Sequence, residues 1–132
     1  MPLVHIHLIK GKSPEYIRAV ADGVHKALGE AFNVPQDDRF QLIHQHDAAD
    51  FIYNASYLGI RRSDDLVILQ IIAGNWRDVP TKQRLYRAIA DNLALAPGLR
   101  QEDVMISLTG VGKEDWSFGN GLASYVDDGS KS

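Results

Sequence analysis

Hydrophobic positions along the chain follow two different spacings, and together they predict a strand–helix–strand unit that occurs twice. Residues 3–9 form a run rich in aliphatic and β-branched residues, which is typical of a strand. The side chains of residues 39–46 alternate between two faces, and this pattern predicts a second strand with one face less buried. Between these strands, residues 14–32 place hydrophobic side chains on one helical face: Ile17, Val20, Ala21, Val24, Leu28, Ala31 and Phe32.

The ends of this first helix are marked by residues that are common at helix termini. Ser13 is a good N-cap, and Pro14 suits the first helical position because its missing N–H group is not needed there. Asn33 and Pro35 then stop the helix. These signals predict one long helix between the two strands.

The second half of the chain repeats this plan. Residues 66–73 form a nearly continuous apolar run, typical of a central strand that is covered on both faces. Asp78 can cap a helix with Pro80 in its first turn, and the hydrophobic face of that helix comprises Leu85, Ile89 and Leu93. Residues 103–108 predict a final short strand. Because strands and helices start at similar intervals in both halves, we expect an internal duplication of one βαβ unit.

Right-handed crossovers would place both helices on the same face of a four-stranded sheet. The opposite face then has no helix of its own, although the central strand is apolar almost throughout. Further copies of the same chain are the simplest cover, so we predict an obligate homo-oligomer with sites near subunit boundaries. The glycine-rich residues 110–125 are too irregular for a core and would suit an inter-subunit strand or hairpin.

Composition limits the classes of function. The chain has 132 residues, which fits one domain, and its net charge of −3 includes no basic stripe, so no nucleic-acid partner is expected. No apolar run approaches the ~20 residues of a membrane span, so we expect no membrane association. With no cysteine, the chain has no disulfide and no cysteine-based zinc site. These features predict a cytoplasmic α/β protein in which only residues 127–132 form a flexible tail.

Pro2 is the most distinctive candidate for chemistry. Initiator methionine is normally removed when the next residue is small, and removal of Met1 would leave Pro2 with a free secondary amine. An α-amino group titrates near ~7.7–8.0, so it can give or take a proton at neutral pH. A secondary amine is also a good nucleophile towards carbonyl groups. The strand that follows at once would hold this amine in one place.

Three segments carry a resemblance to a known family. Val-Pro-Gln-Asp-Asp-Arg-Phe-Gln occupies residues 34–41, Arg-Ser-Asp-Asp-Leu-Val-Ile occupies residues 62–68, and Asp-Trp-Ser-Phe-Gly occupies residues 115–119. Together with Pro2 and the doubled βαβ plan, they resemble the tautomerase superfamily, and in particular its malonate semialdehyde decarboxylase branch. The resemblance covers nearly all of residues 2–126. It implies a single domain over residues 1–126, made of a first unit at 2–60, a second unit at 61–110 and a C-terminal inter-subunit segment at 111–126.

The resemblance implies a role for individual residues. Pro2 would be the protonated amine or general acid, and Asp38 would hydrogen-bond that amine or orient a water molecule. Trp116 and Phe118 would be apolar walls of the site. Arg77 would hold a substrate carboxylate, for which a planar guanidinium fork is well suited. The decarboxylase pattern has two arginines spaced as Arg-x-Arg at this point, whereas this chain has one.

The resemblance further implies a homotrimeric enzyme that uses no cofactor and no metal and acts on a small oxo acid. The reaction is decarboxylation of a 3-oxo acid to an aldehyde and CO₂, or alternatively tautomerisation or hydration of 2-oxo or unsaturated acids such as phenylpyruvate. Pro2 could act as acid, base or nucleophile, depending on its pKa. The apolar walls would lower that pKa by desolvating the cation, whereas Asp38 would raise it.

Two alternatives belong to other classes of protein. His5 and His7, and likewise His44 and His46, are pairs of histidines that each share one face of a strand. If the two strands are adjacent and in register, four imidazoles could meet and bind zinc or copper. The other alternative is an inactive oligomeric binding protein that keeps the fold but has no turnover.

Overall fold

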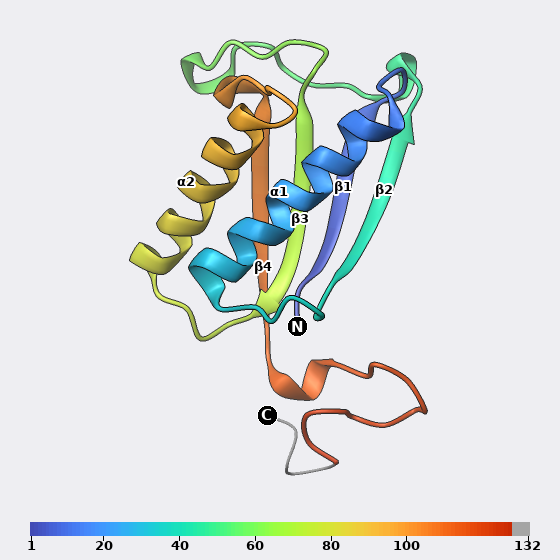
Figure 1. Ribbon diagram of the computed structural model, residues 1–132, viewed down its shortest axis with the longest axis vertical. Helices are drawn as coiled ribbons and strands as arrows, with labels where there is room; N and C mark the ends of the chain where they lie inside the picture. The colour runs from blue at the N-terminus through green and yellow to red at the C-terminus, as the bar shows by residue number, and fades with distance from the viewer. Residues whose placement is uncertain (128–132) are drawn as a thin grey trace.

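The computed structural model describes residues 1–127 and confirms the predicted α/β fold class. Four strands form one mixed sheet in the order β2-β1-β3-β4, and two helices cover one face of it (Figure 1). The elements are β1 (Leu3–Ile9), α1 (Pro14–Phe32), β2 (Phe40–His46), β3 (Val67–Gly74), α2 (Val79–Leu95) and β4 (Val104–Val111).

The predicted helix caps are present. Ser13 Oγ accepts a hydrogen bond of 3.1 Å from the Tyr16 backbone N–H at the start of α1. Asp78 accepts one of 3.0 Å from the Thr81 backbone N–H at the start of α2. Asn33 has a φ of 56°, the left-handed conformation in which many helices end. Caps can be predicted from short motifs because they satisfy backbone groups that the helix itself leaves unpaired.

The two βαβ units meet at the centre of the sheet. β1 pairs in parallel with β2, and β3 pairs in parallel with β4, whereas β1 and β3 run antiparallel. The starts of β1 and β3 therefore lie at opposite ends of the sheet (Figure 1). This is the arrangement expected of one unit used twice.

β4 is longer than predicted. It extends to Val111, whereas the sequence analysis ends the strand at Leu108 because a glycine-rich stretch follows. Pairing with β3 continues through Gly110, which lies opposite Ala73. A Cβ atom at position 110 would come within 3.0 Å of the Asn75 Cβ atom. Close approach of the backbone, and not the end of the strand, therefore explains this glycine.

The hydrophobic core lies between the sheet and the helices. It is formed by alternate residues of the strands and by the inner faces of both helices, including Val4, Ile6, Val20, Val24, Leu69, Ile71, Leu85, Ile89 and Leu93. The other face of the sheet has no helix, and we call it the open face. Side chains on the open face include Leu3, His5, His7, Phe40, Leu42, His44, His46, Ile68, Gln70, Ile72 and Met105.

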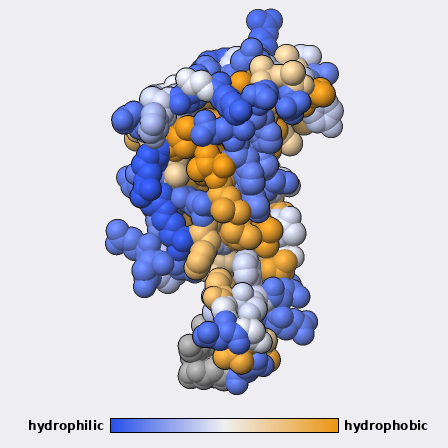
Figure 2. Space-filling model, turned by 90° about the vertical axis from the view of Figure 1, so that its right-hand side faces the viewer, coloured by the Kyte–Doolittle hydropathy of each residue, from blue (hydrophilic) through white to orange (hydrophobic). Residues whose placement is uncertain are grey.

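Several large hydrophobic side chains are exposed on and beside the open face. Phe40 is 50% exposed, Leu42 48% and Met105 46%. Figure 2 views the molecule from its β2 side and shows a band of hydrophobic surface that runs down towards the C-terminal segment between polar regions. Contiguous apolar surface of this kind commonly marks a contact with another protein chain.

The C-terminal segment projects beyond the end of the sheet (Figure 1). It begins with a short 3₁₀ helix at Lys113–Asp115 and then folds back, with the Ser124 backbone N–H donating to the Trp116 carbonyl at 3.2 Å. Residues 128–132 of the predicted tail lie outside the described residues. Within residues 1–127, no helix is both long and apolar enough to cross a membrane.

Candidate active site

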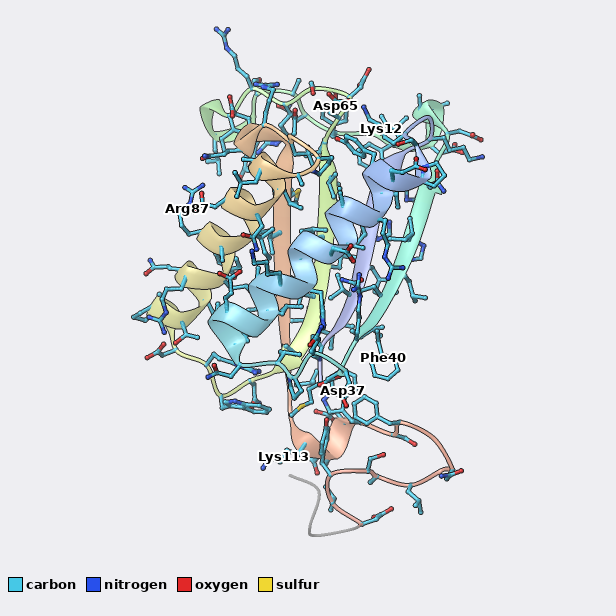
Figure 3. All side chains as sticks on the ribbon, in the orientation of Figure 1. Lys12, Asp37, Phe40, Asp65, Arg87 and Lys113 are labelled. Carbon is cyan, nitrogen blue, oxygen red and sulfur yellow. The ribbon has the colours of Figure 1, made fainter. Side chains whose placement is uncertain are left out.

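A cleft of about 660 Å³ opens at the end of the sheet where β1 begins. It is formed by the N-terminus, the end of α1 with the loop that follows, the turn after β3, and the C-terminal segment. Figure 3 shows Asp37, Phe40 and Lys113 at this same end of the molecule. The lining residues are Met1, Phe32, Asn33, Val34, Pro35, Asp38, Trp76, Arg77, Lys113 and Tyr125.

The N-terminal amine lies in this cleft beside a carboxylate. The Met1 amine forms an ion pair with Asp38, and Pro2 behind it is buried. Burial, and to a smaller extent the positive charge of Arg77, lower the pKa of the Met1 amine from 8.0 to about 6 in spite of the adjacent Asp38 carboxylate. The neighbouring Asp37 is exposed, so Asp38 is the carboxylate that faces the amine.

Arg77 is fixed between two aromatic rings. Its guanidinium carbon lies 4.4 Å from the centre of the Phe32 ring and 4.6 Å from that of the Trp76 ring. The guanidinium donates to the Phe32 carbonyl at 3.1 Å and to the Gly74 carbonyl at 3.4 Å. Burial lowers the pKa of Arg77, which nevertheless stays charged at neutral pH. The cleft therefore contains a cation whose orientation is set before any ligand arrives.

Trp116 and Phe118 form an aromatic cluster beside the cleft. Their rings stack at 5.2 Å, and Phe118 lies 5.7 Å from Phe40 and 5.3 Å from Tyr125. Tyr125 connects this cluster to the cleft, but among residues 1–127 neither Trp116 nor Phe118 belongs to the lining. The Trp116 Nε1–H group is buried and has no acceptor within the described part of the chain.

Several lining residues had no predicted role in the site, among them Phe32, Trp76, Lys113 and Tyr125. Trp76 precedes Arg77 directly, and an aromatic residue next to a candidate binding arginine is a weak signal that could have indicated it. Lys113 and Tyr125 reach the cleft only through the path of the irregular C-terminal segment, for which hydrophobic periodicity gives no information.

Another depression, of about 680 Å³, lies between α1 and β2 and is lined by residues that include Ile17, Arg39 and Gln41. Its lining does not include the predicted site residues Pro2, Asp38, Arg77, Trp116 and Phe118. We place the candidate site in the 660 Å³ cleft because an amine, a carboxylate and a guanidinium meet there.

The two histidine pairs meet the condition set for the metal hypothesis. β1 and β2 are adjacent and parallel, and His7 is paired with His44. The four imidazoles therefore share the open face of the sheet, separate from the lining of the cleft.

Comparison with known proteins assigns the chain to a family. A sequence profile described as "Tautomerase enzyme" matches residues 38–119, and a second profile with the same description matches residues 2–61. The chain belongs to the tautomerase family. It is 39% identical over 127 residues to "Probable tautomerase YusQ" of Bacillus subtilis (strain 168), a match that covers 96% of this chain and 100% of that relative.

Two solved structures resemble this tautomerase-family enzyme. FG41 malonate semialdehyde decarboxylase inhibited by 3-bromopropiolate is 42% identical, with a TM-score of 0.89 and 95% of each chain covered. A symmetric trimer of wild-type fused 4-OT shares the fold at 21% identity, with a TM-score of 0.77 and coverage of 96% of this chain and 98% of that one. The predicted superfamily and its malonate semialdehyde decarboxylase-like branch are thus confirmed.

Proposed function

We propose that this tautomerase-family enzyme decarboxylates a small 3-oxo acid without a cofactor, using the amine of Pro2 after removal of Met1. The observation that carries the proposal is the meeting of the terminal amine, Asp38 and Arg77 in one cleft. The 42% identity to a malonate semialdehyde decarboxylase supports the choice of reaction.

Removal of Met1 would bring the reactive nitrogen one residue further into the cleft. Consecutive Cα atoms are about 3.8 Å apart, so the Pro2 nitrogen lies within one residue of the position that the Met1 amine now occupies. Asp38, which pairs with the Met1 amine, would then face the Pro2 amine. A carboxylate next to the amine favours its cationic form, and this effect on the pKa opposes that of burial.

In the proposed reaction, Arg77 binds the substrate carboxylate and the cationic Pro2 donates a hydrogen bond to the 3-oxo group. The bond between the carboxylate carbon and C2 breaks, and CO₂ leaves. The electron pair of that bond stays on the substrate and forms an enolate, and the cationic Pro2 stabilises the negative charge on the enolate oxygen. Solvent water then donates a proton to the enolate carbon, which gives the aldehyde. Lys113 adds a second positive charge to the cleft lining, which favours anionic substrates.

Keto–enol tautomerisation of a 2-oxo acid is the second candidate, and one observation favours it. Burial lowers the pKa of the Met1 amine to about 6, which favours a neutral amine in this environment. A neutral Pro2 could remove the proton next to the carbonyl as a general base. The two candidates predict opposite pH dependence, because an acid loses activity as pH rises and a base loses it as pH falls.

We also propose that the chain assembles as a homotrimer in which residues 111–126 contact a neighbouring subunit. The open face carries exposed Phe40, Leu42 and Met105, and a protein of the same fold forms a symmetric trimer. Buried polar groups normally have partners, so the Trp116 Nε1–H group is a candidate to donate to a neighbouring subunit or to the substrate.

The first experiment locates the reactive group. Mass spectrometry of the purified chain should show that Met1 is missing. Incubation with 3-bromopropiolate, the compound that inhibits the similar decarboxylase, should then add mass to the N-terminal peptide. Labelling at another residue would contradict the assignment of Pro2. The absence of any labelling in a chain that turns over substrate would contradict it as well.

The second experiment identifies the reaction. CO₂ release from malonate semialdehyde and ketonisation of phenylpyruvate are measured across pH for the wild type and for Pro2→Ala, which carries a primary amine. Pro2→Ala should lose most of the activity, and a basic limb in kcat/KM would support decarboxylation with Pro2 as acid. An unchanged rate in Pro2→Ala would remove Pro2 from the mechanism. Sedimentation velocity on the same samples tests the trimer.

A further inference from the structure

Four histidines from two neighbouring strands gather on the open face of the sheet. His5 and His7 come from β1, and His44 and His46 come from β2. Their rings alternate between the strands: His44 lies 5.0 Å from His5 and 4.5 Å from His7, and His7 lies 5.1 Å from His46. All four side chains are half-buried and none lines the candidate active site.

The ring nitrogens already point towards one another. His5 Nδ1 and His44 Nε2 are 2.8 Å apart, and His7 Nδ1 and His46 Nε2 are 2.9 Å apart. Each contact shares one hydrogen between two nitrogen lone pairs. A metal ion that replaces this hydrogen requires only that each neutral imidazole carry its hydrogen on the other ring nitrogen.

Gln70 on β3 fixes one of these rings in the form that a metal requires. His7 Nε2 lies 2.7 Å from Gln70 Oε1, so Nε2 carries the hydrogen and donates it. The lone pair of His7 is then on Nδ1, which lies 2.9 Å from His46 Nε2 within the cluster. Hydrogen bonds of this kind, from the second nitrogen of a histidine to an oxygen, orient metal-binding histidines in general.

We propose that His5, His7 and His44 bind one transition-metal cation of the zinc type on the open face. A ligand nitrogen from each of the three residues lies within 4.8 Å of the other two. Zinc–imidazole bonds of ~2.0–2.1 Å place ligand nitrogens about 3.4 Å apart, a spacing that modest rotations of the rings can reach.

The surroundings agree with this ligand set. The three donors are all imidazoles, which suit zinc, copper and nickel and do not suit magnesium or calcium. Leu42 lies opposite His5, and Ile68 lies opposite His7 on the other side of β1, so apolar side chains flank the donors. His46 stands next in the stack and can supply a fourth nitrogen.

All three donors come from one chain, so the site does not depend on the proposed trimer or on the proposed reaction. The metal would join β1 to the edge strand β2 and stabilise the folded state, because the unfolded chain has no preformed site. Its role would be structural, since the cluster lies outside the lining of the cleft.

The test uses the full chain without a polyhistidine tag. The protein is stripped with a chelator, incubated with Zn²⁺, passed through gel filtration and analysed for metal. One zinc per chain is expected for the wild type and for the control His25→Gln, whose imidazole lies on α1 and contacts the Gln36 carbonyl. His7→Gln and His44→Gln should retain none, and Gln70→Leu should lower the affinity about 10- to 100-fold.

Nitrogen NMR of the wild-type histidine rings gives a measurement that does not depend on the folding of any variant. Addition of one equivalent of Zn²⁺ should shift the ring nitrogens of His5, His7 and His44 and leave those of His25 unchanged. Substoichiometric zinc in the wild type, zinc retained by both His7→Gln and His44→Gln, or unchanged ring resonances would overturn the proposal. The cluster would then be a stack of hydrogen-bonded imidazoles only.

Discussion

Replacement of Arg77 by methionine tests the central electrostatic contact of the proposed site. Methionine keeps an unbranched chain of similar reach but removes the guanidinium. A charge-assisted hydrogen bond contributes about 1.5–3 kcal/mol, so losing the contact with a substrate carboxylate should raise KM about 10- to 150-fold. Because the contact is made by the carboxylate before the bond breaks, we expect kcat to change less than KM.

The structure also predicts what Arg77→Met does to stability. The guanidinium donates at 3.1 Å to the Phe32 carbonyl at the end of α1 and stacks between two rings. Loss of two hydrogen bonds and two cation–π contacts costs about 3–4 kcal/mol, which is less than the about 5–15 kcal/mol that stabilise a typical domain. The variant should therefore remain folded, and its kinetics can be interpreted.

Arg84→Met is the matched control. Arg84 is exposed on α2, donates to Thr81 Oγ1 at 3.0 Å, and carries the same charge as Arg77. Initial rates are measured for both variants over a range of oxo-acid concentrations. An ester analogue, which lacks the free carboxylate and cannot be decarboxylated, is measured as a competitive inhibitor. A KM for Arg77→Met within about twofold of the Arg84→Met value, or an equal loss of affinity for the ester, would refute the assignment of Arg77 as the carboxylate-binding residue.

Three further changes have defined outcomes. Gly74→Ala should push the Trp76 ring away from its present position, because the new Cβ would overlap that ring. The ring would then lose its cation–π contact with Arg77, worth about 0.5–1 kcal/mol, and KM should rise about two- to fivefold in the same assay. Asp103→Asn should lower the free energy of unfolding by about 2–3 kcal/mol, because this fully buried carboxylate accepts two hydrogen bonds of 2.7 Å from Ser63. An unchanged midpoint of urea unfolding would contradict this prediction. A chain that retains Met1 should lose stability relative to the same chain with an acetylated N-terminus as pH falls from about 8 to about 6, because the pKa of its amine is lowered from 8.0 to about 6 and the unfolded state then binds more protons. Parallel urea midpoints for these two chains would contradict the lowered pKa.

The fold could be predicted closely because its signals are local. The cap at Ser13, the stop at Asn33 and the cap at Asp78 each depend on residues within one turn of the helix. The prediction failed at Gly110, where the backbone of β4 passes close to Asn75. The need for a residue without a Cβ atom at position 110 arises from the way the strands pair. The residue preferences along a single strand therefore cannot predict it.

The site was predicted less completely than the fold. Pro2 and Asp38 could be proposed because the motif around Asp38 follows the first helix in the order that the family shows. The contributions of Trp76 and Tyr125 to the cleft depend on how separate segments meet in space. The distance between the two histidine pairs likewise depended on strand order, which periodicity alone leaves open.

Joining two βαβ units in one polypeptide makes the two ends of the sheet chemically unequal. At the start of β3, Leu66 is linked by a peptide bond to Asp65, and an amide nitrogen has no basic lone pair with which to accept a proton. Lys12 pairs with Asp65 there (Figure 3). Asp103 accepts hydrogen bonds from Ser63. Each chain can thus carry an N-terminal amine at one end of the sheet only, while residues at the opposite end need only hold the second unit in place.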